Sequence, residues 1–313
     1  MGAQLTRMLT IGLFCIGFSL AAVSPLSAGE LEDHKTFDRL GVEEYSTGAR
    51  AELAGFQTLH GLVLSVQACA FLDCGDAPRL AVALPTLGAG IGLVGSLVAT
   101  SDRGITPGHA TALNSGAVWG GWLSFAGGYM VGDLDSQDTT GLMMLGQLAG
   151  VGVGHALAMN LRPTAGDVRL INSAGAWSAF YYLIFTEALL ELNQERRTAG
   201  LGLIGATTLG AVGAGALASQ YPMSRGRVGL ISSAGILGGL AGLATPILIL
   251  GDDASGRQVA TGASIGAAAG MVVGTILTED FDDPEEYPRA DMTFSIHPSV
   301  DGQGIQAGLS GSF

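Results

Sequence analysis

The residues that could do chemistry in this chain are three histidines, two glutamates and a recurrent pair of small polar residues. His60, His109 and His155 lie in separate apolar runs, without the HxxxH or HxxE spacing that places two metal ligands on one helix. Glu187 and Glu191 follow an aromatic run, and Glu187 stands close enough to its end to reach a membrane interface. Neither set forms a catalytic or metal-binding pattern. We therefore predict a protein that is not an enzyme and that has no metal or cofactor.

The recurrent pair is Asn or Ser followed by Ser, and it occurs three times within apolar runs. The three pairs are Asn114 with Ser115, Asn172 with Ser173, and Ser232 with Ser233. Polar side chains inside an apolar helix must find hydrogen-bond partners, either on a neighbouring helix or along a solute path. Because the pair recurs once per copy, as a structural element does, we favour bonds between helices. A pore for small solutes lined by these residues stays as the alternative.

Each pair belongs to a longer segment that the chain repeats three times. The copies begin at the hydroxyl residues Thr106, Thr164 and Ser224, at spacings of 58 and 60 residues, and each has a glycine two positions further on. A hydroxyl residue at this position is typical of a helix N-cap. Trp119 and Trp177 occupy matching positions in the middle of two copies, where we expect them to pack into glycine grooves. A period of this length indicates a supersecondary unit whose copies pack on one another.

The composition favours a membrane. Only 13% of the residues are charged, against about 25% in a typical soluble domain, and mean hydropathy is +0.43. Residues 51–278 form eight apolar runs, most of them near the ~20 residues of a membrane helix. Small residues recur at every fourth position, as in the row Gly262, Gly266, Gly270, Gly274. On a helix such a row forms one flat face that lets another backbone approach closely.

We therefore predict a mainly α fold, a membrane bundle of repeated Gly-zipper helical hairpins with about eight helices. Each hairpin is expected to join a Gly-row helix, across a short basic loop, to the hydroxyl-capped helix that follows it. The net charge of −13 argues against a nucleic-acid partner. The expected partners are membrane lipid and further subunits, in a homo-oligomer or an envelope complex.

The N-terminus predicts export. Residues 1–28 have the charged start, apolar stretch and small-residue cleavage site of a signal peptide, so the mature chain should begin near Gly29. Residues 29–50 are expected to form an acidic surface segment. In an exported protein Cys69 and Cys74 could form a disulfide, and two free thiols are the alternative.

The C-terminus predicts a small β element. After an acidic linker at residues 279–291, residues 292–313 alternate apolar and polar side chains around a Gly-containing turn, which is typical of a β-hairpin. The last strand ends in Phe313 and resembles, over about nine residues, the C-terminal signal of bacterial outer-membrane barrels. The aromatic residue often found at the third position from the end is absent, since Gly311 stands there. The resemblance keeps open a Gly-rich outer-membrane β-barrel as an alternative fold.

The loop charges also bear on location. Arginines gather in the loops at one end of the expected bundle and acidic residues in those at the other. With an exported N-terminus and eight spans, the basic loops would lie outside, against the positive-inside rule for an inner-membrane protein. We therefore expect a cell-envelope protein, in the outer rather than the inner membrane. Its expected role is structural or oligomerising, built on close helix packing.

Overall fold

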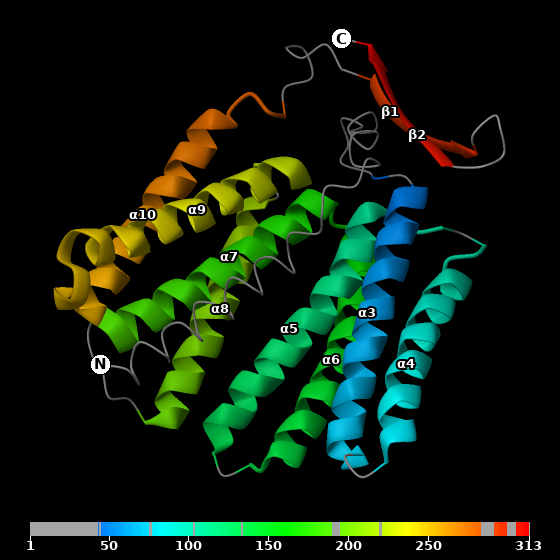
Figure 1. Ribbon diagram of the computed structural model, residues 1–313, viewed down its shortest axis with the longest axis horizontal. Helices are drawn as coiled ribbons and strands as arrows, with labels where there is room; N and C mark the ends of the chain where they lie inside the picture. Colours follow the sequence, from blue (N-terminus) through cyan, green and yellow to red (C-terminus); the bar gives the residue numbers. More distant parts are fainter. Residues whose placement is uncertain are drawn as a thin grey trace.

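The computed structural model describes residues 43, 45–74, 77–102, 104–132, 134–189, 195–218, 221–282, 291–298 and 305–312. This part of the chain is mainly helical and contains eight α-helices, as the apolar runs predicted. They are α3 (Thr47–Phe71), α4 (Pro78–Ala99), α5 (Pro107–Val131), α6 (Ser136–Leu161), α7 (Ala165–Leu183), α8 (Arg196–Ala218), α9 (Arg225–Leu250) and α10 (Gly256–Leu277) (Figure 1). A π-helical turn, η3 (Ile184–Leu189), extends α7, and a 3₁₀ turn, η4 (Gly251–Asp253), follows α9. Strands β1 (Asp291–Pro298) and β2 (Ile305–Ser312) pair antiparallel, with Phe294 opposite Leu309.

The helices form four hairpins, in which α3 packs on α4, α5 on α6, α7 on α8, and α9 on α10. Each hairpin thus joins a hydroxyl-capped helix to the Gly-row helix that follows it, across an acidic turn. The predicted pairing, in which the Gly-row helix joins the next capped helix across the basic loop, is wrong. Glycine rows occur on both kinds of helix. The sequence therefore did not determine whether a Gly-row helix pairs with the helix before it or with the helix after it.

Within the hairpins, glycines on both helices bring the two backbones into contact. A methyl group at Gly116 of α5 would overlap the carbonyl oxygen of Gly150 on α6, and one at Gly120 would overlap that of Gly146. The α9–α10 and α3–α4 hairpins make the same kind of backbone contact. Gly152, on the opposite face of α6, has open space around it. The close approach therefore depends on particular glycines and not on the glycine content as a whole.

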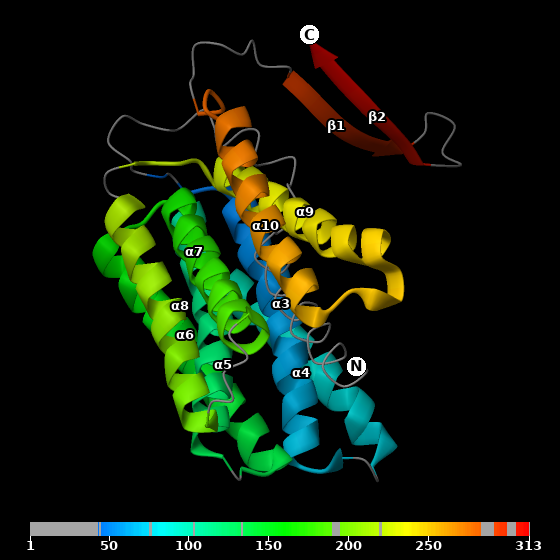
Figure 2. The same ribbon diagram turned by 90° about the vertical axis from the view of Figure 1, so that its left-hand side faces the viewer.

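The hairpins follow one another by a constant rule. The first helix of each hairpin contacts both helices of the next: α3 contacts α5 and α6, and α5 contacts α7 and α8. In the last step α7 contacts α9, and its extension η3 contacts α10. Figures 1 and 2 show the N-terminal ends of the four capped helices gathered at one end of the bundle, from which the hairpins spread. We call this end the cap end.

Six of the eight helices are long and apolar enough to cross a membrane; the other two described helices, α5 and α7, are less apolar. Both lie in the interior of the array, between the hairpins on either side. They can carry polar side chains such as Asn114 and Asn172 because protein rather than lipid surrounds much of their surface. The six apolar helices mark the chain as a helical membrane protein. The alternative of a Gly-rich outer-membrane β-barrel is wrong, because the residues it required as strands are helical.

The first helix of each hairpin begins with a hydroxyl N-cap, and these four helix starts are one more than the three repeated segments. Ser46, Thr106, Thr164 and Ser224 each accept a hydrogen bond from the backbone nitrogen three residues on, at 3.0 to 3.2 Å. Ser46 precedes Thr106 by 60 residues and has Gly48 two positions on, as the other copies do. Helix α3 therefore begins a first copy of the repeat, inside the predicted surface segment 29–50. This copy is not evident in the sequence because α3 has no Asn/Ser-Ser pair.

Candidate functional site

The repeated polar pairs lie at the contacts between successive capped helices. Gln57 of α3 donates its side-chain N–H to Asn114 Oδ1 of α5 at 3.3 Å. Between α7 and α9, the hydroxyl groups of Ser173 and Ser232 lie 2.7 Å apart. Each contact between neighbouring capped helices therefore contains at least one side-chain hydrogen bond, and we call this series the inter-repeat ladder.

The middle rung of the ladder is the most highly connected. Asn172 of α7 donates from Nδ2 to Ser115 Oγ of α5 at 2.6 Å and accepts at Oδ1 from the Trp119 indole nitrogen at 2.8 Å. A Cβ atom at Gly175 would lie 3.0 Å from the Trp119 ring, so the indole packs against this glycine. Trp177 packs in the same way on Gly235 of α9, which confirms the prediction that these tryptophans fill glycine grooves.

Five of the six predicted polar residues therefore bond across helices. Ser233, the sixth, is part-exposed on α9, after which no further capped helix follows in the described chain. Within the described residues its hydroxyl makes no bond to another helix. It occupies the same position in its copy as Ser115 and Ser173 do in theirs, at the end of the ladder.

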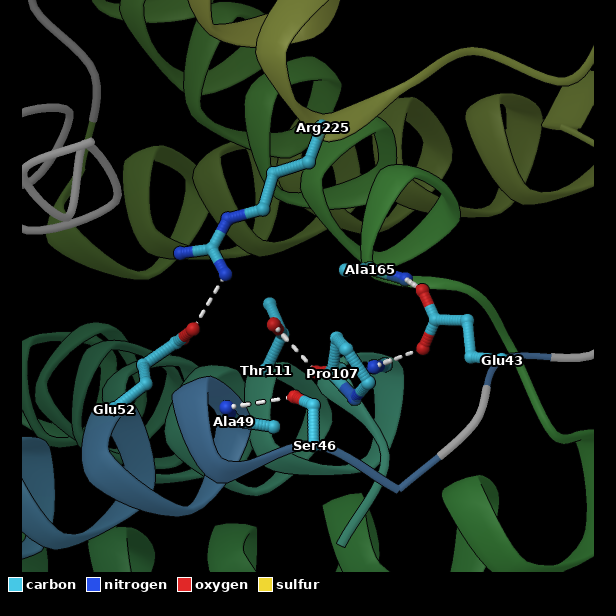
Figure 3. A network of polar contacts seen from close by, with 9 residues as sticks. Glu43, Ser46, Ala49, Glu52, Pro107, Thr111, Ala165 and Arg225 are labelled. Atoms are coloured by element: carbon cyan, nitrogen blue, oxygen red, sulfur yellow. Dashed lines mark hydrogen bonds and ion pairs between the residues drawn. The ribbon is translucent and has the colours of Figure 1, made fainter. Parts of the chain in front are cut away.

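A second polar group ties the helix starts together at the cap end (Figure 3). The Glu43 carboxylate accepts from the backbone nitrogen of Gly108, in the first turn of α5, and from that of Ala165, in the first turn of α7, the latter at 2.6 Å. The first N–H groups of a helix lack partners within the helix and carry its positive dipole. One carboxylate therefore neutralises two helix ends in adjacent hairpins. Ser46 adds a bond from its backbone nitrogen to the Ile105 carbonyl at 3.2 Å.

Two ion pairs lie at the same end. Glu52 of α3 bonds Arg225 at the start of α9, and these side chains are only 19% and 14% exposed (Figure 3). Arg227 lies 3.7 Å from Asp282, just after α10. The first and last hairpins thus meet through Glu52 and Arg225. Carboxylates of the protein itself pair with Arg225 and Arg227. These two arginines therefore contribute less free positive charge to the basic end of the bundle than the sequence indicates.

A third group is a row of polar side chains between α3, α5 and α6. His60 of α3 is 7% exposed, and its Nδ1 lies 3.2 Å from Gln57 Oε1. Gln147 of α6 is equally buried and donates to Gln67 Oε1 of α3 at 2.9 Å. With Asn114, these residues form what we call the α3 polar row. The row could not be predicted from the sequence, because Asn114 and Gln147 belong to other apolar runs than His60.

The other two histidines meet each other. His109 Nε2 of α5 and His155 Nδ1 of α6 lie 2.9 Å apart, a contact that no sequence spacing indicated. In the described part of the chain no three His, Cys, Asp or Glu residues come together as metal ligands. The backbone of Glu187 lies in η3, whereas its side chain and the whole of Glu191 lie outside the described residues.

Cys69 and Cys74 are free thiols near the end of α3. A hydrogen bond between the two side chains raises the pKa of the Cys74 thiol, and its burial adds to the effect. The disulfide considered from the sequence is not formed in this structure. The predicted signal peptide, most of the predicted acidic segment 29–50, most of the predicted linker 279–291 and Phe313 lie outside the described residues.

Comparison of the chain with protein-family models, with curated proteins and with solved structures finds no match in any of the three. The class defined by the fold is a helical membrane bundle of four repeated hairpins. Its function must be inferred from the residues themselves.

Proposed function

We propose that the protein is a non-enzymatic structural component of a cell-envelope membrane, a scaffold built from four closely packed hairpins. The observation that carries this proposal is the inter-repeat ladder, in which the repeated polar residues bond successive capped helices. At Asn172 both ends of the amide are engaged, one with Ser115 and one with Trp119. A residue lining a solute path would leave such groups facing the path. The ladder instead uses them to hold helices together, as expected in lipid, where apolar burial gives no driving force between helices.

The glycine contacts support the same proposal. Backbone contact at pairs such as Gly116 with Gly150 supports the Gly-zipper that we propose, because it increases the van der Waals contact between helices. Glycines with open space around them, such as Gly152 on α6 and Gly205 on α8, lie on other faces. These faces would allow a second copy to approach closely, so we include a homo-oligomer or envelope complex in the proposal.

We further propose export by the N-terminal signal peptide and residence in the outer membrane, with the C-terminal β-hairpin and Phe313 contributing to assembly there. The charge of the loops supports this location less than the sequence suggested, because Arg225 and Arg227 pair with Glu52 and Asp282. The test is density-gradient separation of the two membranes after an alkaline carbonate wash, with an internal tag that leaves Phe313 free. Recovery with the inner membrane would contradict the location, and release into the soluble fraction would contradict membrane residence.

The structural role is tested by replacing Asn172 with Leu in proteoliposomes and measuring protease resistance of the bundle and permeability to small solutes. If the protein is a scaffold, Asn172→Leu should lower the protease resistance of the bundle. The wild-type protein should then be impermeable to small solutes. The alternative, a pore lined by the repeat Asn and Ser residues, predicts wild-type permeability that Asn172→Leu and Asn114→Leu abolish while the bundle stays intact.

A further inference from the structure

His109 of α5 and His155 of α6 bring two imidazole rings together across the second hairpin. His109 Nε2 and His155 Nδ1 lie 2.9 Å apart, and the two ring centroids lie 5.0 Å apart. The histidines are 46 positions apart in the chain, so no spacing in the sequence could indicate the pair. Neither side chain belongs to the inter-repeat ladder or to the α3 polar row. The structural role proposed above therefore leaves this pair without an assigned role.

The backbones of the two helices hold the rings in place. His109 lies in the first turn of α5 and donates its backbone N–H to the Thr106 hydroxyl at 3.2 Å. Next to His155, Gly154 is buried, and a methyl group there would overlap the Ala112 carbonyl oxygen of α5. The two backbones thus touch beside the histidines. Side chains on packed helices are positioned more precisely than side chains on loops.

The distance between the two nitrogens suits a metal ion. An imidazole nitrogen binds such an ion at about 2.0–2.1 Å, so two of them at a right angle lie about 2.9 Å apart. A right angle is the angle between adjacent ligands in the tetragonal geometry that copper(II) prefers. The observed separation of His109 Nε2 from His155 Nδ1 is also 2.9 Å. The rings need only turn about their side-chain torsions to direct both lone pairs at one ion.

Both rings can serve as neutral ligands. In the hydrogen bond between them, one of the two facing nitrogens carries a proton and the other offers a lone pair. When that proton moves, by exchange with water, to the outer nitrogen of the same ring, both facing nitrogens have lone pairs available. Each lone pair then forms one bond to the ion, and neither ring changes its charge. Water can reach the pair, since His155 is exposed and lies within about two turns of the end of α6.

We propose that His109 and His155 form a binding site for a transition-metal ion, copper(II) in preference, near the cap end of the second hairpin. Imidazole suits copper, zinc and nickel, and among these divalent ions copper binds most strongly. Calcium and magnesium prefer oxygen ligands. In the described part of the chain no third His, Cys, Asp or Glu residue joins the pair. Water therefore fills the remaining positions around the ion, which should exchange with solvent. This site is independent of the structural role proposed for the ladder.

The test is titration of the full chain with copper(II) in nanodiscs, without a polyhistidine tag. Cys69→Ser and Cys74→Ser remove the two described thiols and give the parent protein. Pulsed EPR counts the imidazoles on the ion through their remote nitrogens, and we expect one ion per chain with two imidazoles. His109→Gln and His155→Gln should each leave one imidazole and lower the affinity about tenfold or more. Copper should raise the unfolding temperature of the parent protein more than that of either variant, because the ion joins two helices.

The matched control is His297→Gln, which removes a histidine of strand β1. It should leave the number of bound imidazoles and the copper affinity unchanged. The proposal is overturned if the parent protein binds copper through one imidazole or none, or if both single variants retain two imidazoles. It is equally overturned if the parent protein and both variants have the same affinity. Since each histidine is replaced separately, one variant provides the answer even if the other does not fold.

Discussion

Trp119 donates its indole N–H to Asn172 Oδ1 at 2.8 Å and at the same time packs its ring against the neighbouring helix at Gly175. One side chain therefore supplies both a hydrogen bond and a shape fit between the second and third hairpins. The two residues are 53 positions apart in the chain, close to one repeat length. The bond thus joins different positions of successive copies, since Asn172 matches Asn114 and Trp119 matches Trp177 in the repeat.

Asn172→Leu should destabilise the bundle by about 1–3 kcal/mol, because it leaves the Trp119 indole and the Ser115 hydroxyl without their partner. The measurement is equilibrium unfolding in mixed micelles. Asn160→Leu is the control, since among the described residues Asn160 bonds to the Ala156 carbonyl of its own helix and to no other helix. We expect its effect to stay within about 0.5 kcal/mol. Equal effects of the two variants would show that the ladder contributes nothing to stability.

Gly150→Ala and Gly152→Ala should have opposite effects on the stability of the bundle, although the two glycines lie two residues apart on the same helix. The new methyl group at position 150 would overlap the Gly116 carbonyl, so the hairpin must separate at a cost of about 2 kcal/mol or more. A methyl group at position 152 would have no described atom within 4 Å and should stabilise the helix by up to about 1 kcal/mol. Thermal unfolding in detergent gives the comparison, and a loss of stability in Gly152→Ala would contradict it.

Much of the fold could be predicted from the sequence because its signals are local. The apolar runs gave the eight helices, and a hydroxyl residue followed by a glycine gave three helix starts. The partner of each helix could not be predicted in the same way. Glycine rows such as that containing Gly116 and Gly120 occur on both helices of a hairpin, so periodicity alone does not determine which rows meet.

The partners of the candidate site residues could not be predicted from the sequence either. Asn172 could be recognised as a residue in need of a partner, but its partners on α5 follow from the stacking of hairpins and not from spacing. The contact of His60 with Gln57 lies within one run, whereas the bond from Gln147 to Gln67 joins two runs 80 residues apart and could not be predicted from spacing. The first copy of the repeat, at Ser46, could have been found by extending the 60-residue spacing of the caps toward the N-terminus.

Alkylation of Cys74 should be slow at pH 8, because the hydrogen bond with Cys69 and the burial of the thiol raise its pKa and reduce the thiolate fraction. The rate should increase at higher pH. Cys69→Ala removes the largest cause of the shift, so the pH at which the Cys74 rate is half-maximal should fall. Mass spectrometry after timed iodoacetamide treatment measures this. A half-maximal pH that is the same in both proteins would contradict the role of Cys69.

Glu43→Ala should destabilise the cap end by about 1–3 kcal/mol, since it removes the acceptor for one N–H of α5 and one of α7 and a negative charge at two positive helix ends. The stability of Glu43→Gln should lie between that of Glu43→Ala and that of the wild type, because its amide retains one carbonyl oxygen but turns an N–H group toward the other helix.

Hydrogen exchange of Glu43→Ala, followed by mass spectrometry, should show faster exchange than in the wild type in the first turns of both α5 and α7. Neutralising Asp253, which is exposed in η4, serves as the charge-matched control and should leave these turns unchanged. Faster exchange in α5 alone would mean that Glu43 caps one helix and does not join the two hairpins.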